Sequence, residues 1–240
     1  RNFSSDIFYN EKNYKRKKAF ENFWKNNFSK LYDLTIKLKK KLWMRSKHPE
    51  AGIKGLNLAN NIDTKEIDNH HLIKNILRNI LGNNYSLLIK RFVAGMPTKK
   101  IPGWIVNKIN NAQDTNLGEF IKPKYRDMTY FHGIDFHQDV ISKGTSTSDF
   151  ITLYVYLNKV KKNMAPLIVV PKSHIFGITT FPHKISFLSN KKQIIYDDRR
   201  GNKKKLKIKM LTGETGQVYF WSGLTLHGTQ SASVEDDSIR

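Results

Sequence analysis

The segment His132–Val140 reads HGIDFHQDV and combines strand-forming residues with two side chains that bind metals, His137 and Asp139. Residues i and i+2 of an extended chain project from the same face, so this imidazole and this carboxylate can reach one ion together. A second strand-like segment, LTLHG, carries His227 far along the chain. Two histidines and one carboxylate form the facial triad that leaves open positions on non-haem iron. Taken alone, a His-x-Asp pair is more often a hydrogen-bonded surface pair.

The chain around this segment reads as a series of short strands from about Tyr125 onward. Apolar, aromatic and β-branched residues fill both parities of Phe150–Leu157 and Pro166–Val170, as expected for strands buried between layers. Short strands at this spacing indicate a sandwich or a barrel. Later strands are predicted at Gln193–Tyr196, Leu206–Met210, Gln217–Trp221 and Leu224–His227.

The first third of the chain reads as helical. Apolar residues recur every three or four positions over Phe20–Leu42, which predicts an amphipathic helix docked through one face. A second helix is predicted to begin near Asp63, where Glu66 completes a capping-box pattern, and to end at Gly82. A further short helix is expected at Trp104–Ile109.

The composition indicates one globular protein of 240 residues, with 39% hydrophobic and 12% aromatic residues. The chain has no cysteine, which excludes disulfides, thiolate metal sites and thiol catalysis; a reducing, cytoplasmic location is therefore expected. No apolar run approaches the roughly 18 residues that a membrane span requires. Because the chain opens on Arg1 and stops at Arg240 directly after a motif, we expect a fragment of a longer polypeptide.

Forty-two Lys and Arg against twenty Asp and Glu give a formal net charge of +22, which raises nucleic acid, acidic membranes and anionic substrates as partners. The basic residues cluster at Lys37–Lys47 and Arg199–Lys209. The simpler interpretation is a solvated, lysine-rich surface, because charge runs rarely specify a partner alone. No RNA- or DNA-binding motif accompanies the clusters, so nucleic acid is not the expected partner. If the lysines have a functional role, they favour an anionic small-molecule substrate.

From Tyr125 to Arg240 the sequence resembles the phytanoyl-CoA dioxygenase family. The matching stretches are FHQDV around His137, NMAPLIVVPKSH at Asn163–His174 and FWSGLTLHGTQ at Phe220–Gln230. Family members show an H-x-D motif, then an N-G-P-L-like strand that runs into P-G-S-H, then H-G-S and an Arg about a dozen residues further on. Three ordered matches make chance a poor explanation.

The resemblance implies an iron(II)- and 2-oxoglutarate-dependent dioxygenase that uses O2, hydroxylates an unidentified small molecule and releases succinate and CO2. It implies that His137, Asp139 and His227 are the catalytic metal ligands, and that Thr229 and Arg240 hold the distal carboxylate of 2-oxoglutarate. A guanidinium suits the last role because it can bind a carboxylate through two hydrogen bonds. Related halogenases lack the carboxylate ligand, so an intact Asp139 favours hydroxylation.

The fold that we expect is mainly β with α: a cupin-like jelly roll, or double-stranded β-helix, with N-terminal helices packed on the outside. Residues 1–124 would form the helical region and residues 125–240 the catalytic core, truncated at its C-terminal end. Two other functions stay open. One is a cupin-like metal isomerase or a catalytically inactive relative on the same fold, and the other is a basic nucleic-acid-binding protein.

Several residues depart from the family pattern. Met164 and Lys172 replace family glycines, which predicts altered turns beside the pocket, and Lys143 stands where some relatives carry an aromatic residue. Arg240 follows His227 by thirteen positions, slightly more than is usual, so a different Arg could bind 2-oxoglutarate.

Other candidates have weaker patterns. His132 has the opposite strand parity to His137, which indicates a structural role. His174 is expected to brace the loop at the pocket mouth. Thr152 and Tyr154 share one strand face, where either could contact the co-substrate, but core packing is the simpler interpretation.

Overall fold

The computed structural model describes residues 7–34, 62–88, 90–109, 114–126, 128–139, 150–176, 184–188, 192–229 and 238–239. The chain divides into two compact units. The first consists of Arg1–Ala112 and Asn116–Phe131, and the second of Gln113–Thr115 and His132–Arg240. The predicted division into a helical region 1–124 and a catalytic core 125–240 stays a prediction.

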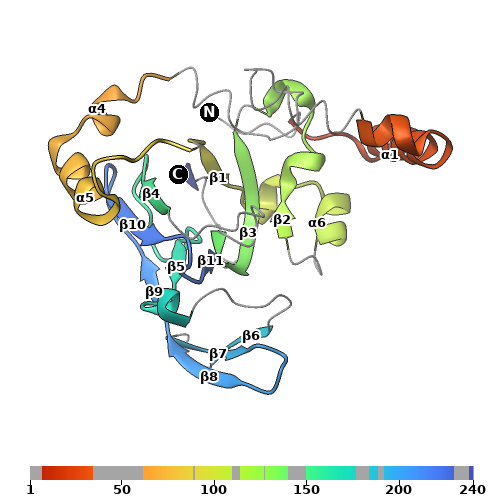
Figure 1. Ribbon diagram of the computed structural model, residues 1–240. Coiled ribbons are helices and arrows are strands. Elements are labelled where there is room, and N and C mark those ends of the chain that lie inside the picture. The colour runs from red at the N-terminus through yellow and green to blue at the C-terminus, as the bar shows by residue number, and fades with distance from the viewer. Residues whose placement is uncertain are drawn as a thin grey trace. The chain divides into compact units, whose positions relative to one another are not determined.

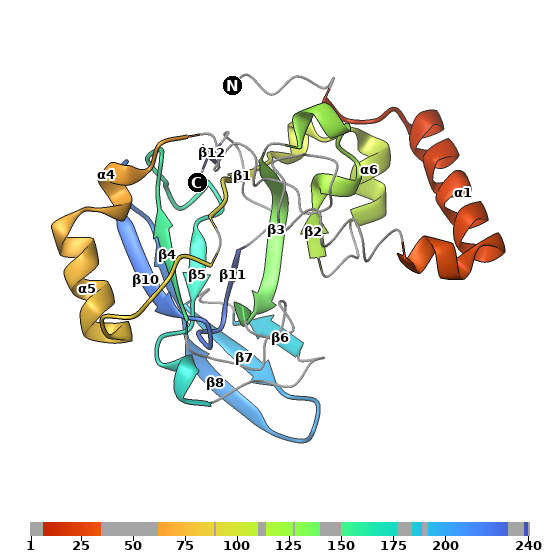
Figure 2. The same cartoon turned by 45° about the horizontal axis from the view of Figure 1, so that its top comes forward.

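Helices dominate the first unit (Figures 1 and 2). They are α1 (Glu11–Asn27), α4 (Lys65–Asp68), α5 (His71–Leu81) and α6 (Gly103–Ile109), with the 3-10 turns η3 (Thr98–Lys100), η4 (Leu117–Glu119) and η5 (Pro123–Tyr125). Helix α6 confirms the short helix predicted near Trp104. The strand β1 (Val93–Gly95) pairs in parallel with the first three residues of β3 (Thr129–His137), a strand that continues into the second unit. None of the described helices is long and apolar enough to span a membrane.

Helix α1 begins earlier than the predicted apolar stripe and buries little of it. The Asn10 side chain caps its N-terminus by accepting a hydrogen bond of 2.8 Å from the backbone N–H three residues on. Tyr14 is buried, with its ring 5.2 Å from the Trp104 ring. Phe20 and Phe28 of the predicted stripe are exposed, so the expectation of a docked apolar face is wrong for the described part of the helix. The C-terminal part of the stripe lies outside the described residues.

The second predicted helix is two helices, α4 and α5. The chain turns at Asn69 and His70, and His70 has an extended conformation at the N-terminus of α5. Gly82 ends α5 as predicted: its φ of 80° lies in the left-handed region, and its N–H donates a 2.8 Å hydrogen bond to the Arg78 carbonyl.

The second unit is built from antiparallel strands. Within it, β3, β11, β5 and β9 are neighbours in that order, β4 pairs with β10, and β7 lies between β6 and β8. These pairings confirm most of the predicted strands. The bounds are β2 (Asp114–Asn116), β4 (Ile151–Val155), β5 (Leu167–Val169), η6 (Ser173–Phe176), β6 (Lys184–Phe187), β7 (Gln193–Asp197), β8 (Lys203–Lys207), β9 (Lys209–Leu211), β10 (Val218–Ser222), β11 (His227–Thr229) and β12 (Ser238–Ile239).

The segment Leu206–Met210, predicted as one strand, belongs to the two strands β8 and β9. Leu206 lies opposite Ile194 of β7, whereas Met210 lies opposite Ile168 of β5. The chain therefore passes from one sheet to another between β8 and β9. Its alternating apolar side chains pack against one core on both sides of this step, which is why the pattern looked like a single strand.

The segment Leu224–His227, also predicted as one strand, is a turn followed by a strand. The Thr225 N–H donates a 2.8 Å hydrogen bond to the Ser222 carbonyl, and β11 begins only at His227. Leu226, between the turn and the strand, is 1% exposed and anchors this start in the core. That core unites residues from β3, β5 and β7, namely Phe136, Ile168, Val170, Ile194, Tyr196 and Leu226.

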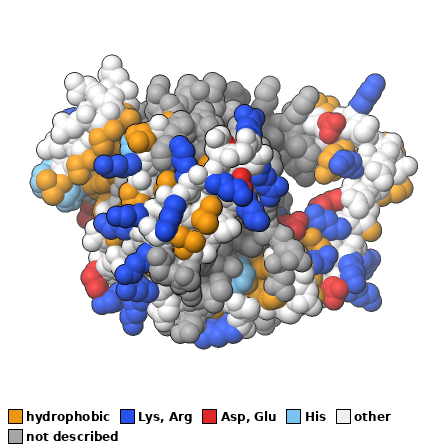
Figure 3. Space-filling view, turned by 90° about the horizontal axis from the view of Figure 1, so that it is seen from below, with side chains coloured by type: hydrophobic (Ala, Val, Ile, Leu, Met, Phe, Trp, Pro, Cys, Tyr) orange, Lys and Arg blue, Asp and Glu red, His pale blue; other side chains and the backbone are white. Residues whose placement is uncertain are grey.

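The second basic cluster, Arg199–Lys209, is a solvated surface over much of its length. All four lysines of β8, Lys203, Lys204, Lys205 and Lys207, are exposed. Figure 3 views the molecule from the side on which this hairpin lies in Figure 1, with Lys and Arg (blue) spread over the face and few acidic side chains (red). The first basic cluster, Lys37–Lys47, lies outside the described residues. Among the described residues the architecture is mainly β with several helices, and it contains several sheets and no closed barrel.

Candidate metal centre

Two strands bring the first two side chains of the site together. His137 is the last residue of β3 and His227 is the first residue of β11, and the two residues lie directly opposite each other in the antiparallel pair. Directly opposed residues project from the same face of a sheet. The imidazole rings are accordingly 4.4 Å apart between centroids, at an interplanar angle of 48°.

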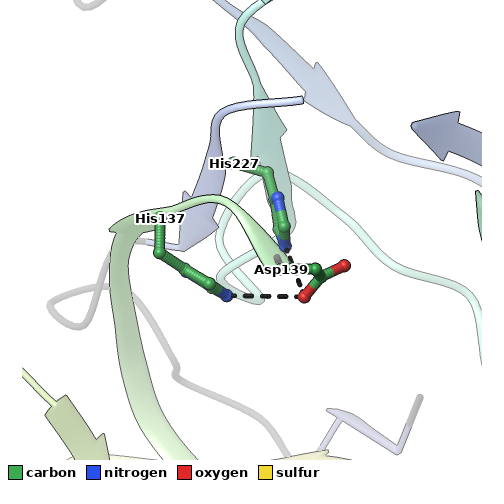
Figure 4. A group of neighbouring side chains, drawn as sticks. All are labelled: His137, Asp139 and His227. Carbon is green, nitrogen blue, oxygen red and sulfur yellow. Dashed lines mark ion pairs between the residues drawn. The ribbon is translucent and has the colours of Figure 1, made fainter. Parts of the chain in front are cut away.

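Asp139 supplies the third group, just beyond the end of β3. One of its carboxylate oxygens, Oδ1, lies 3.8 Å from Nε2 of His137 and 3.8 Å from Nε2 of His227 (Figure 4). The three atoms that could bind an ion all lie within 4.8 Å of one another. The structure thus brings together the three residues that the sequence predicted as metal ligands.

Thr152 fixes the orientation of the carboxylate. Its hydroxyl, on the neighbouring strand β4, donates a 2.7 Å hydrogen bond to Oδ2 of Asp139. The other oxygen, Oδ1, is the one that faces both histidines. The sequence indicated that Thr152 could contact the co-substrate but did not reveal its hydrogen bond to Asp139. The pattern within one strand does not show which residues of other segments lie against that strand.

A backbone carbonyl fixes the tautomer of His227. Nδ1 of His227 lies 2.8 Å from the Thr225 carbonyl oxygen, which can only accept a hydrogen bond. In the neutral imidazole Nδ1 therefore carries the hydrogen, and the Nε2 lone pair points toward the carboxylate side of the group. His227 is 5% exposed, so this orientation is enforced by packing as well.

Two buried polar side chains hold the segments that carry the site. Gln138, which has the opposite parity to its neighbours, is fully buried and donates through Nε2 to the Leu224 carbonyl in the turn before β11. Ser173 donates to the Val170 carbonyl and accepts from the Leu226 N–H, both at 2.7 Å. The bracing role predicted for His174 thus belongs to its neighbour Ser173, while His174 is exposed.

Gly228 allows β11 to approach β3 closely. A Cβ atom at this position would lie 2.8 Å from the Ile134 carbonyl oxygen and 3.1 Å from Cα of Phe136, both backbone atoms that cannot move aside alone. The position of His227 therefore depends on the glycine that follows it.

We expect Gly228→Ala to push β11 away from β3 and to lower the free energy of unfolding by about 1–3 kcal/mol, the usual cost of overpacking. Because His227 is carried on the same strand, Fe(II) affinity should fall as well. Chemical denaturation and metal titration measure the two effects. Gly103→Ala is the matched control, since a Cβ there meets nothing within 4 Å. Equal stability of the two variants would contradict the close approach.

The remaining predicted site residues have mixed outcomes. Thr229, in β11, accepts a 2.8 Å hydrogen bond through Oγ1 from the Ile134 N–H, which leaves its hydroxyl hydrogen free for a further acceptor. Arg240 and Lys143 lie outside the described residues. His132 is buried within β3 and is not part of the group of three.

Positive φ angles locate the altered turns. Lys172 has a φ of 64°, a conformation that favours glycine, as expected for a position where the family carries glycine. In the preceding turn the left-handed residue is Ala165, with a φ of 48°, and not its neighbour Met164. The lysine and the alanine therefore keep glycine-like turns beside the site at the cost of local backbone strain.

The donor set fits a divalent transition metal. Atoms that bind one ion at about 2.1 Å are at most about 4.2 Å apart. Both nitrogen–oxygen separations of 3.8 Å meet this limit, and the three donor atoms all lie within 4.8 Å of one another. Metal binding would require both imidazoles in the neutral form. A carboxylate that is partly removed from water, like that of Asp139, is stabilised by pairing or metal coordination. Imidazole and carboxylate together suit iron(II), among other first-row metals.

Comparison with known proteins adds an independent finding. A family model described as "Phytanoyl-CoA dioxygenase (PhyH)" matches residues 22–234, nearly the whole chain. The match includes all three residues of the cluster as well as Thr229. A search of curated proteins finds no match to this chain.

Proposed function

Because the chain belongs to the phytanoyl-CoA dioxygenase family, we propose that it is an iron(II)- and 2-oxoglutarate-dependent dioxygenase that hydroxylates a small molecule. The observation that carries the proposal is the convergence of His137, Asp139 and His227 on one point. Membership of the family implies an oxygenase in the broad sense. The metal ligands, the co-substrate and the reaction are the finer parts of the proposal.

The residues of this chain would hold and orient the reactants. When bound, iron(II) with 2-oxoglutarate and O2 would supply the oxidation, with succinate and CO2 as co-products. The three residues would leave other positions of the ion open for these reactants. The carboxylate of Asp139 occupies the position that is empty in related halogenases, which favours hydroxylation.

Thr229 and Arg240 are proposed to hold the distal carboxylate of 2-oxoglutarate. The Thr229 hydroxyl accepts from the Ile134 N–H and so can direct its own hydrogen to a carboxylate oxygen. Arg240 would add a guanidinium, which binds carboxylates with two parallel hydrogen bonds. Its role rests on the family resemblance alone.

We propose that the strands form a cupin-like jelly roll with the metal between its two sheets. Support comes from the hydrogen bond between Thr152 and Asp139, because Thr152 belongs to the β4–β10 pair and the histidines belong to β3 and β11. The cluster therefore has strands of two different sheets around it. Packing of the N-terminal helices outside the major sheet stays part of the proposal.

The substrate is proposed to be a small molecule, and an anionic one if the excess of Lys and Arg has a functional role. A formal charge of +22 attracts anions over distances comparable with the Debye length, about 8–10 Å in physiological salt.

The test is an anaerobic titration with Fe(II) and then 2-oxoglutarate, monitored for the visible charge-transfer band of the iron chelate. We expect the band in the unaltered protein and its loss in His137→Ala. A folded protein that binds iron and gives no band would instead be a cupin-like metal isomerase or an inactive relative. Binding of nucleic acid with a steep salt dependence, in a protein that binds no iron, would favour the basic nucleic-acid-binding alternative.

A further inference from the structure

The indole N–H of Trp221 has no acceptor among the residues that the structure describes. Trp221 lies on β10 and is 9% exposed, its Nε1 atom is buried, and no described residue accepts a hydrogen bond from it. An indole nitrogen is only a donor, and buried indoles normally find a partner because an unmade hydrogen bond costs free energy. The buried N–H therefore requires an acceptor from outside the described residues, and a bound ligand can supply one.

The Trp221 ring lies beside one residue of the cluster, His227. Trp221 is directly opposite Thr152 in the β4–β10 pair, so both side chains project from the same face. Thr152 uses that face to bind the Asp139 carboxylate, and the Trp221 ring is 5.4 Å from the His227 ring. The indole thus lies against His227 and beside Thr152, the residue that hydrogen-bonds to Asp139.

The surrounding packing holds the indole in place. The Tyr154 ring lies 5.5 Å away at 43°, and Leu167 and Leu211 share a buried cluster with Trp221. A donor that is already fixed loses little conformational entropy when a ligand arrives, so its hydrogen bond contributes more fully to binding.

We propose that the Trp221 indole N–H donates a hydrogen bond to a carboxylate oxygen of 2-oxoglutarate when this co-substrate binds at the metal centre. A charged acceptor is favoured because a hydrogen bond to a carboxylate is roughly twice as strong as one to a neutral oxygen. The inference rests on the proposed function, which requires a carboxylate-bearing ligand beside the same three residues.

Trp221→Phe tests this role because it keeps an aromatic ring and deletes the N–H. With Mn(II) in place of iron, calorimetry should show at least about tenfold weaker binding of 2-oxoglutarate, the usual loss for one charge-assisted hydrogen bond. The affinity for Mn(II) itself should be unchanged, because the indole is not a metal ligand. Trp104→Phe is the matched control: it deletes another indole N–H, on α6, and should leave both affinities unchanged.

A second measurement uses the unaltered protein and so does not depend on how the variant folds. The chain has four tryptophans, whose indole N–H groups give separate proton–nitrogen resonances. The resonance that is missing from Trp221→Phe identifies Trp221. With diamagnetic Zn(II) in the site, addition of 2-oxoglutarate should move this resonance downfield, as a new hydrogen bond to a carboxylate requires.

The outcomes separate the inference from the function on which it rests. A metal-loaded protein that binds no 2-oxoglutarate would overturn both. Normal binding in Trp221→Phe, together with an unmoved Trp221 resonance in the unaltered protein, would overturn the inference alone. Weaker binding in Trp221→Phe and a downfield shift would together support it.

Discussion

Replacing Asp139 by alanine is expected to weaken Fe(II) binding by more than about 100-fold, because loss of a partner that merely orients a ligand already costs 10–100-fold. The substitution removes the one anionic group of the cluster and one of its three donors. It also leaves the Thr152 hydroxyl without its acceptor. Anaerobic calorimetry with Fe(II) measures the affinity, and turnover of 2-oxoglutarate should disappear with it.

Asp198→Ala is the control for the loss of a carboxylate from the same unit. Asp198 lies in the turn between β7 and β8, where a hydrogen bond from the Asn202 side chain holds the pKa of its carboxyl below the ordinary value. That residue is half-buried in the turn and is not part of the cluster, so Fe(II) affinity should be unchanged. If both variants bound iron equally well, the cluster would not be the iron site.

Thr152→Val should weaken Fe(II) binding by about 10–100-fold, the range found when an outer partner of a metal ligand is lost. Valine fills the volume of threonine but cannot donate to Oδ2 of Asp139, so the carboxylate loses the contact that sets its orientation. Metal titration of the folded variant measures the effect.

Thr152→Ser gives the matched comparison because it keeps the hydroxyl and removes only a methyl group. Its Fe(II) affinity should stay close to that of the unaltered protein. An equal loss in the valine and serine variants would mean that Thr152 acts through packing in the β4–β10 sheet and not through its hydrogen bond.

The sequence predicted the three clustered residues well because two local rules were sufficient. The i, i+2 spacing placed His137 and Asp139 together, although Asp139 lies just beyond the strand, and the family-like stretch around His227 supplied the third residue. Thr152 could not be identified in the same way, since its role depends on which strand lies against the end of β3. Trp221 is similar: only the three-dimensional structure reveals that its N–H is buried and that none of the described residues accepts a hydrogen bond from it.

The strands β4, β5 and β7 were predictable because each apolar run in the sequence lies in a single strand. The fold was not predictable between β8 and β9, where an unbroken alternation crosses from one sheet to another. Helix α1 shows a different limit of sequence patterns. Its regular apolar stripe correctly indicated a helix, but the described residues of the stripe at Phe20 and Phe28 are exposed. At Lys172, where the family carries glycine, the backbone still has a left-handed conformation. The tertiary structure therefore imposes a positive φ that a lysine by itself disfavours.

The most direct test of the central claim is anomalous diffraction at the iron edge from crystals soaked anaerobically with Fe(II). We predict one strong peak within bonding distance of Nε2 of His137, Nε2 of His227 and a carboxylate oxygen of Asp139. The absence of a peak at this point, or a single peak held by other residues, would contradict the assignment of these three side chains as the metal centre.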